Sequence, residues 1–220
     1  SKRLFVSSKN TNTNETSMGV ERMNVHDLIA RNRAGEPVGL PCFCTANEHV
    51  LRSVLAYAAE TGLPTVIEAT SNQVNQYGGY TGMTPKDFMT WLEGMAAEVG
   101  VPMDQLILGG DHLGPQAWRH MNAKAAMAKA EVLLRDYVAA GFQKIHLDCS
   151  EGCAGDPAQL GDDVTAERSA QLARVCREAG EDLLFVVGTE VPPPGGARMD
   201  EYGDIPPTKP DAARTTLLAH

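Results

Sequence analysis

The sequence LGGDHLGP (residues 108–115) places an acid and an imidazole side by side, at Asp111 and His112. The apolar run QLILGG before this pair is typical of a buried strand, so the pair marks the end of that strand. A histidine there can offer a ring nitrogen to a metal ion, and the aspartate can give or take a proton at a bound substrate. The alternative is a loop cap, in which Asp111 accepts backbone N–H groups before Pro115. The pair is a candidate for chemistry, with Asp111 as acid/base and His112 as metal ligand.

A second group of polar residues lies in IHLDCSE (residues 145–151). Its alternation puts His146 and Asp148 on one face of a predicted strand, with Ser150 just beyond the end. A single buried histidine is commonly a satisfied core residue. Asp148 closes an apolar strand, where an unpaired carboxylate would be costly, so metal ligation or a buried ion pair would each explain it. We count Asp148 as a candidate metal ligand, and His146 and Ser150 as candidate substrate-binding residues.

Two glutamates end other predicted strands. Glu190 follows DLLFVVGT, and the VPPPGG behind it predicts a stiff turn that holds this carboxylate at the strand end. Glu190 is therefore a candidate metal ligand, unless it only fixes its own loop. Glu68 ends PTVIEA (residues 64–69) and either has a similar role or simply pairs with a lysine inside the fold.

The segment SNQVNQYGGYTGM (residues 71–83) supplies amides, hydroxyls and glycines directly after that strand. Such a loop can bind sugar hydroxyls or a phosphate through side-chain amides and free backbone N–H groups. The alternative is a polar surface loop, but the length and the Tyr-Gly-Gly-Tyr favour binding. The candidate substrate-binding residues of this segment are Ser71, Asn72, Gln73 and Gln76.

Strands and helices alternate in the elements that must position these residues. The sequence predicts strands at residues 38–44, 64–69, 105–110, 143–148 and 182–190. It predicts helices at residues 48–61, 85–99, 116–140 and 163–179. In the first helix Val50, Val54, Leu55 and Ala58 keep the spacing of a buried face, and Gly62 is the expected C-cap. Thr84 caps the second helix, which Pro85 opens and Gly100 ends.

Apolar strands that alternate with helices predict a parallel sheet, either open and doubly wound or closed into a barrel. No GxGxxG follows the first strand and no GxxxxGK[ST] occurs, which argues against the open nucleotide-binding version. A barrel gathers the polar residues of all these strand ends at one mouth. We predict an α/β fold, a (β/α)8 TIM barrel of which about the first five βα units are present. Residues 23–220 form this domain, and the polar residues 1–22 are expected to be a flexible arm.

Composition excludes several classes of protein. The 220 residues are 43% hydrophobic and carry a net charge of −9 without a Lys/Arg cluster, which argues against nucleic acid as a partner. No apolar stretch approaches the roughly 20 residues that span a bilayer, and no secretory signal is expected. Five cysteines, an odd number, favour reduced thiols and a cytoplasmic location. The spacings of the two cysteine pairs, with one and three residues between the members, do not match a four-cysteine zinc site.

Five segments together resemble the Z-subunit family of tagatose-bisphosphate aldolase, in order and spacing, from about residue 24 to the C-terminus. They are EATSNQVNQYGGYTGMTP, ILGGDHLGP, AGFQKIHLD, CAGDP and GTEVPPPGG. More distantly, the pattern is similar to class II, metal-dependent ketose-bisphosphate aldolases, which are barrels. The resemblance implies that Asp111 matches the acid of aldol chemistry, His112 a zinc ligand, and Asp148 an acidic residue near the metal. It further matches Glu190 to a glutamate before a Gly-Gly pair, and Ser71 and Asn72 to the residues that open the loop after strand two.

The sequence also departs from the class II aldolases. Their two further histidine ligands and their phosphate-binding glycines come from later strands, which are absent here. Phe43 stands near the place of their strand-one asparagine. A single Asp-His pair cannot by itself hold a catalytic zinc ion.

Three functional hypotheses follow from the resemblance. The first is a non-catalytic subunit that supports a separate catalytic aldolase subunit in tagatose and galactitol-type sugar catabolism. The second is a metal-dependent epimerase or aldolase of ketoses or their phosphates, with a divalent ion, first of all zinc, and Asp111 as acid/base. The third is a sugar-phosphate-binding barrel without catalysis, and each is compatible with a homo-oligomer. The label tagatose 6-phosphate kinase, also used for this family, has no support because the sequence lacks a phosphate loop.

Overall fold

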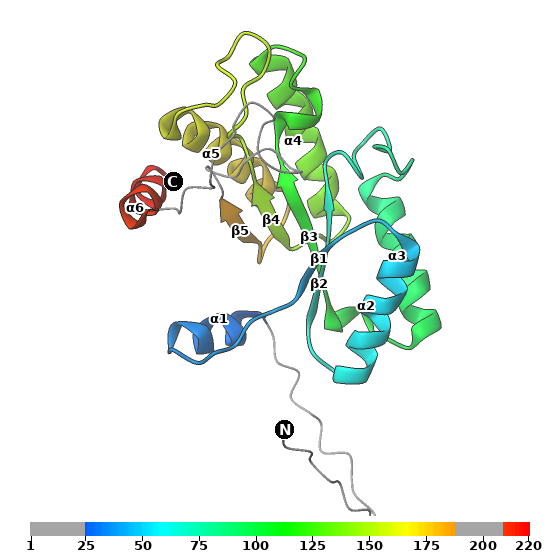
Figure 1. The fold of residues 1–220 in the computed structure, drawn as a ribbon. Coiled ribbons are helices and arrows are strands. Elements are labelled where there is room, and N and C mark those ends of the chain that lie inside the picture. Colours follow the sequence, from blue (N-terminus) through cyan, green and yellow to red (C-terminus); the bar gives the residue numbers. More distant parts are fainter. Residues whose placement is uncertain (1–24, 188–208) are drawn as a thin grey trace, which may run out of the picture.

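The computed structural model describes residues 25–187 and 209–220, which form a parallel sheet with helices packed along it (Figure 1). The strands are β1 (Cys42–Cys44), β2 (Thr65–Thr70), β3 (Leu106–Leu113), β4 (Lys144–Leu147) and β5 (Leu184–Val187). The α-helices are α1 (Val25–Arg33), α2 (Glu48–Thr61), α3 (Pro85–Val99), α4 (Ala123–Ala139), α5 (Asp162–Ala179) and α6 (Pro210–Ala219). Two short 3-10 helices are η1 (Met103–Gln105) and η2 (Pro115–Trp118).

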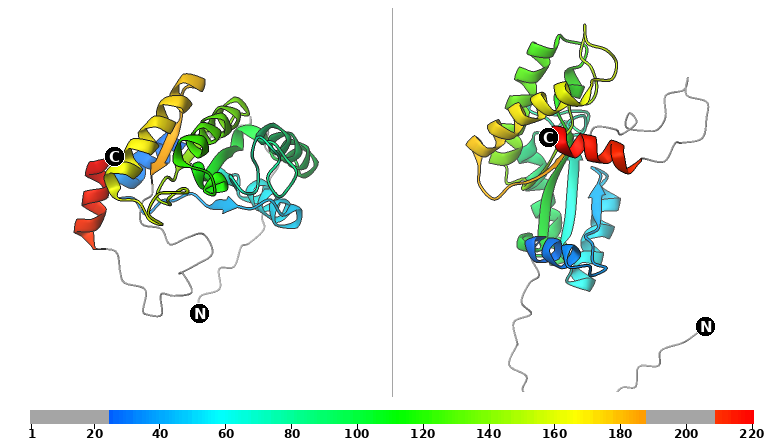
Figure 2. Two further views of the ribbon diagram at one scale, coloured as in Figure 1. Left: turned by 90° about the horizontal axis from the view of Figure 1, so that it is seen from above. Right: turned by 90° about the vertical axis from the view of Figure 1, so that its left-hand side faces the viewer.

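The strand order identifies the type of α/β fold. The five strands are all parallel and lie in the order β1-β2-β3-β4-β5, so every described connection steps to the next strand in the same direction. A doubly wound sheet would reverse its order at one point, whereas a barrel does not. Seen from above, α2 to α5 follow an arc outside the curved sheet (Figure 2). The predicted barrel architecture is thus confirmed for five βα units.

Several predicted helix ends are confirmed. Gly62 ends α2 in the left-handed conformation as predicted, and at the start of this helix Asn47 accepts the backbone N–H groups of His49 and Val50. A capping box between Thr84 and Asp87 starts α3. Pro85 stands in the first turn of that helix, and Gly100 ends it.

Other predictions about the elements were wrong. The strand expected over residues 38–44 is formed only by Cys42–Cys44. Val50 is 46% exposed, because the buried stripe of α2 begins at Leu51 instead. The helix expected from residue 116 is interrupted: η2 ends at Trp118, and α4 begins at Ala123 with Asn122 as its cap. Residues 188–190 of the fifth predicted strand lie outside the described residues, and α6 forms near the C-terminal end.

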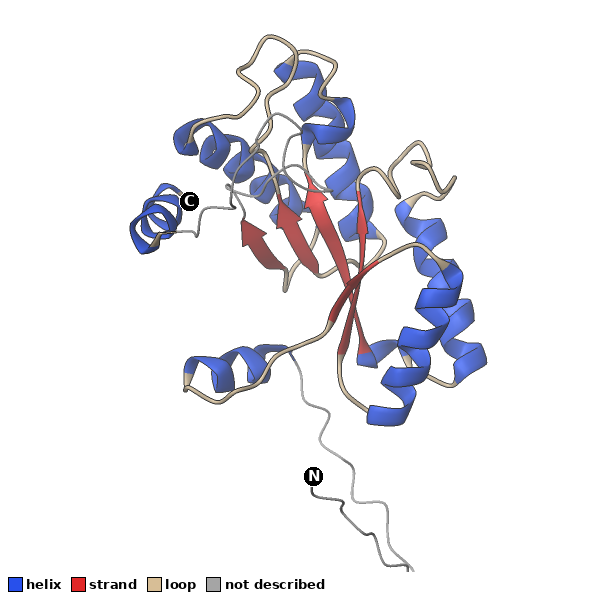
Figure 3. Cartoon of the chain, in the orientation of Figure 1, coloured by secondary structure: helices blue, strands red, loops and turns tan. Residues whose placement is uncertain are grey.

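The two faces of the sheet have different chemistry. Side chains such as Phe43, Ile67 and Ile145 pack into the apolar core toward the helices. The register puts the alternate residues on the opposite side, which we call the inner face. This face carries most of the polar side chains of the strands: Cys42, Cys44, Glu68, Thr70, Asp111, Lys144 and His146. The carboxyl ends of β2 to β5 point to one edge of the sheet (Figure 3), where a barrel places its functional site.

Candidate metal centre

A β-bulge at the end of β3 brings Asp111 and His112 to the same place. Gly110 pairs with Ile145 and Leu113 with Leu147, so β3 has one more residue than β4 between these two pairs. His112 takes the left-handed conformation, with φ of 49°, which few non-glycine residues adopt. In a regular strand these two neighbours would point to opposite faces. The bulge lets both side chains reach His146 on β4.

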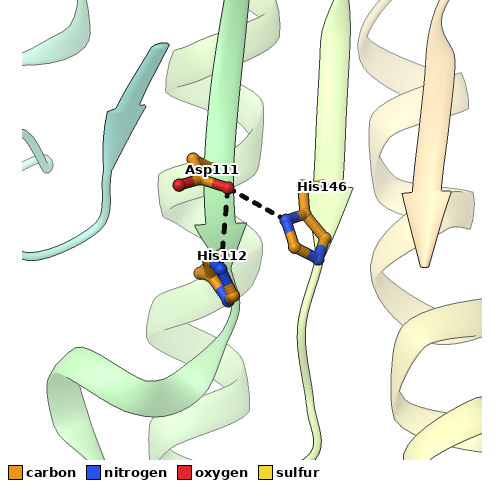
Figure 4. A group of neighbouring side chains, drawn as sticks. All are labelled: Asp111, His112 and His146. Atoms are coloured by element: carbon orange, nitrogen blue, oxygen red, sulfur yellow. Dashed lines mark hydrogen bonds and ion pairs between the residues drawn. The ribbon is translucent and has the colours of Figure 1, made fainter. Parts of the chain in front are cut away.

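Asp111, His112 and His146 form a compact group, which we call the trio (Figure 4). Asp111 Oδ1 lies 3.0 Å from His146 Nδ1 and 3.7 Å from His112 Nε2. The two imidazole rings are 4.4 Å apart between centroids. One ligand atom from each residue can be chosen such that all lie within 4.8 Å of one another. The trio therefore offers one carboxylate and two imidazoles to a common point.

Asp148 orients His112 from behind. Its Oδ2 lies 2.8 Å from His112 Nδ1, and its Oδ1 accepts hydrogen bonds from the Ser150 hydroxyl at 2.6 Å and the Ser150 backbone N–H at 3.0 Å. Gly114 allows β3 to approach this residue, since a Cβ there would lie 1.9 Å from the Asp148 carbonyl oxygen. A carboxylate that accepts from Nδ1 directs the Nε2 lone pair away from itself, as in carboxylate–histidine–metal arrangements.

The hydrogen bonds determine the charge state of these groups. Burial opposes ionisation of Asp111, yet hydrogen bonds from His146 and Cys44 and the nearby His112 lower its pKa to about 2. Burial likewise opposes ionisation of Asp148, but His112 and Ser150 lower its pKa below the ordinary range. The hydrogen bond to Asp148 raises the pKa of His112. Both carboxylates are therefore ionised at neutral pH, and both Nδ1 atoms face an acceptor.

The donor set fits a divalent metal ion. His146 Nε2 is buried and has no hydrogen-bond partner among the described residues, although its ring is held through Nδ1. Such an orphaned lone pair is costly unless a ligand completes it. Nitrogen and carboxylate donors suit zinc, and three protein ligands with a further open position are typical of catalytic zinc sites. Asp111, His112 and His146 would hold the ion, with Asp148 behind His112.

The residues predicted as metal ligands do not all lie in the trio. His112 is part of the trio, while Asp148 contacts the opposite nitrogen of the His112 ring. His146, expected among the substrate-binding residues, stands in the trio and supplies a second histidine. Glu190 lies outside the described residues. Glu68 pairs with Lys144, as one of its two alternatives predicted.

The loop after β2 is fixed mainly by its own contacts. Gln73 Oε1 accepts the Thr70 backbone N–H at 2.9 Å and lies 3.8 Å from Cys44 Sγ, which connects the loop to the inner face. Gln76 Nε2 donates to the Lys129 carbonyl of α4 at 3.0 Å. Ser71 is buried and Asn72 is exposed. Of the four predicted residues, Gln73 is thereby connected to the neighbourhood of Asp111 through Cys44.

Sequence reasoning missed three residues that build this site. Asn75 is buried and bonds the backbone of Ser71, Tyr77 and Gly79, which shapes the loop. Tyr137 of α4 donates to the Val74 carbonyl at 2.9 Å and so holds the loop against the barrel. Cys44 contacts Asp111 from β1. The Asn in a turn-rich segment is a usable signal for the first of these, whereas the other two contacts join residues far apart in the sequence.

The fold and the site together define the class of protein: a βα barrel with a carboxylate–histidine group at the carboxyl edge of its strands. A sequence model of one protein family matches residues 25–220, and this family is described as D-tagatose-1,6-bisphosphate aldolase subunit GatZ/KbaZ-like. The chain belongs to this family. No helix among residues 25–187 and 209–220 is long and apolar enough to cross a membrane.

The chain is also similar to several solved structures. A protein of Sinorhizobium meliloti 1021, described as a probable tagatose 6 phosphate kinase, is 43% identical with a TM-score of 0.75, covering 83% of this chain and 43% of that chain. This chain thus spans less than half the length of that relative. D-Psicose 3-epimerase of Clostridium cellulolyticum H10 is 14% identical with a TM-score of 0.40, over 67% of this chain and 51% of its own. Fructose-bisphosphate aldolase of Campylobacter jejuni is 19% identical with a TM-score of 0.36, over 72% and 55%.

Proposed function

We propose that this chain acts as the accessory subunit of a tagatose-bisphosphate aldolase, bound to a separate catalytic aldolase subunit. The observation that carries this proposal is the family match over residues 25–220. The substrate of the assembly would be a ketose bisphosphate, in the breakdown of tagatose and galactitol-type sugars. Because all five cysteines are free thiols, we place the protein in the cytoplasm.

The accessory role is tested by co-expressing the chain with a catalytic aldolase subunit. We expect the two chains to co-purify, and the aldolase activity to survive heating longer with this chain than without it. Failure to co-purify, together with unchanged activity and heat resistance of the catalytic subunit, would refute the role. A kinase activity is not proposed, because the sequence carries no phosphate loop.

A second function is favoured by the trio, since a purely supporting subunit needs neither a buried orphan nitrogen nor an oriented histidine. This function is a metal-dependent aldolase or epimerase of a ketose or ketose phosphate. A divalent ion, zinc in the first instance, would supply Lewis-acid polarisation of a substrate carbonyl. In this function Asp111, ionised at neutral pH, would accept a proton at the neighbouring carbon instead of binding the ion, which His146 and the His112 ring oriented by Asp148 would then hold.

The net charge of the site favours the binding of a divalent cation. Asp111 and Asp148 are ionised, and Glu68 forms an ion pair with Lys144, so two negative charges remain when both histidines are neutral, as they are when they bind a metal ion. A divalent cation would neutralise them, whereas an anionic sugar phosphate alone would be repelled. The third hypothesis, a barrel that binds sugar phosphate without metal or catalysis, is therefore the weakest of the three.

Metal content decides whether the second function stands. We expect purified protein to contain close to one zinc, or another divalent ion, per chain by mass spectrometry. The content should fall in His112→Ala and in His146→Ala and remain in His49→Ala, whose imidazole lies on the exposed face of α2. Absence of metal from the wild-type protein, even after incubation with Zn²⁺, would refute this second function and leave the accessory role.

A further inference from the structure

A buried ion pair lies on the inner face directly below the trio. The Lys144 ammonium on β4 donates to Glu68 Oε1 on β2, and only 19% and 7% of the two side chains are exposed. Lys144 stands two residues before His146, on the same face of β4. The pair thus connects the strand of His146 to a strand that is not its neighbour.

Gly109 of β3 makes this connection possible. It pairs with Glu68 on one side and with Lys144 on the other, so it lies between the two charges. A Cβ at this position would lie 2.8 Å from both Cγ and Oε1 of Glu68. The glutamate therefore crosses β3 through the space that the missing side chain leaves.

Fold stability gives little reason for such a pair. Removing two charges from water costs free energy that their attraction repays only in part, and apolar replacements of buried pairs are often neutral or stabilising. An ion pair does, however, fix the distance between the two strands that carry its residues. The pair is better explained by a need for geometry than by a need for stability.

The backbone hydrogen bonds between β3 and β4 do not fix the distance between these strands at the trio. The regular pairing of β3 with β4 stops at Gly110 and resumes at Leu113, and Asp111 and His112 lie in the gap. On β4 the gap faces His146, whose described ladder partner is Val186 of β5. The Glu68–Lys144 pair is the side-chain connection just below the gap, and the Asp148 N–H to Leu113 carbonyl bond, 3.0 Å long, closes it above.

We propose that the Glu68–Lys144 pair is a positioning pair, which holds β4 so that His146 meets Asp111 and His112 in a metal-binding arrangement. This inference rests on the proposed metal binding. It assigns to two residues outside the trio a role in the affinity and geometry of the metal rather than in folding.

The test uses the full chain and Co²⁺ or Zn²⁺ alone. In Glu68→Gln/Lys144→Met both charges are removed together, so that no buried charge is left unpaired. We expect its urea unfolding midpoint without metal to stay near that of the wild type. We expect its affinity for Zn²⁺, measured by calorimetry, to fall about tenfold or more, as for the loss of other residues that orient ligands. The visible spectrum of bound Co²⁺, which reports ligand geometry, should change as well.

Two further variants separate positioning from general damage. Removing the exposed Arg52–Glu98 pair by Arg52→Met/Glu98→Gln should leave Co²⁺ spectrum and Zn²⁺ affinity unchanged. The exchange Glu68→Lys/Lys144→Glu keeps a pair and should recover most of the lost affinity. If the uncharged variant does not fold, the exchanged variant tests the proposal instead. An exchanged variant that folds but binds Zn²⁺ weakly overturns the positioning role.

The outcomes also separate this inference from the function on which it rests. A wild-type protein that binds neither ion would overturn the metal proposal and the positioning role with it. A wild-type protein that binds, beside an uncharged variant that folds and binds equally tightly with the same Co²⁺ spectrum, would overturn the positioning role alone.

Discussion

Replacing Gly114 by alanine should damage both the fold and the candidate metal centre. Gly114 has extended backbone, with φ of 177° and ψ of −163°, so the substitution causes no conformational strain of its own. The new Cβ would lie 1.9 Å from the Asp148 carbonyl oxygen, while ordinary contact begins at 3.4 Å. The ends of β3 and β4 must therefore separate by well over 1 Å.

The cost follows from this displacement. Overpacking a well-filled site costs about 1–3 kcal/mol. The adjacent hydrogen bond from Asp148 N–H to the Leu113 carbonyl, 3.0 Å long, would stretch beyond its range, and such a bond contributes about 0.5–1.5 kcal/mol. We expect Gly114→Ala to lower the free energy of unfolding by about 2–4 kcal/mol. Since Asp148 orients His112, the affinity for Zn²⁺ should fall too.

Urea unfolding followed by circular dichroism measures the first effect, and calorimetric Zn²⁺ titration measures the second. Gly94→Ala in α3 is the matched control, because a Cβ there meets nothing within 4 Å. This change should stabilise the protein by about 0.5–1 kcal/mol, as glycine is a poor helix former. A Gly114→Ala protein that is within about 0.5 kcal/mol of the wild type would refute the close-approach reasoning.

Three other expectations concern single contacts. Asp148→Asn removes the acceptor that orients His112 and should weaken Zn²⁺ binding about 10- to 100-fold, measured by competition with a chromogenic chelator; unchanged affinity would contradict the orienting role. Tyr137→Phe removes the hydroxyl bonded to the Val74 carbonyl and should cost about 1–2 kcal/mol in urea unfolding; a cost near zero would mean that this bond does not hold the loop. Thr84 lowers the pKa of Asp87 from its ordinary 3.8, so this carboxylate stabilises α3 fully above that pH and progressively less as the pH falls through its lower folded pKa. The stability difference between wild type and Asp87→Ala should accordingly shrink below about pH 4 in denaturant titrations, and a difference that is constant from pH 7 to pH 2 would disprove the linkage.

The fold was predictable because its signals are local. Apolar strands alternate with amphipathic helices, and residues such as Asn47, Thr84 and Gly62 mark helix ends through contacts within one turn. The break between η2 and α4 was not visible, since the segment before Ala123 carries residues that suit a helix as well. Val50 fits the same helical spacing as Leu51, and only the packing of α2 on the sheet decides which of them is buried.

The candidate site was predictable in its members but not in its arrangement. Each of Asp111, His112, His146 and Asp148 stood out by chemistry at a strand end. Which ring nitrogen faces which carboxylate depends on the bulge in β3, and a one-residue insertion into the ladder leaves no periodic signal. The pairing of Glu68 with Lys144 joins residues 76 positions apart and needs the gap at Gly109, so it follows from tertiary structure alone.

The bulge and its partners have a consequence for the order of folding. The trio, Asp148 and Ser150 all come from the unit β3–α4–β4 and the loop directly after it, within about 45 residues of sequence. Contacts confined to one such unit close short loops and form early, whereas joining the ends of a barrel requires contacts between distant parts of the chain. We expect the carboxylate–histidine group to assemble as soon as β4 docks beside β3. Under the proposed metal binding, an ion would find its three ligands assembled as soon as β3 and β4 have paired.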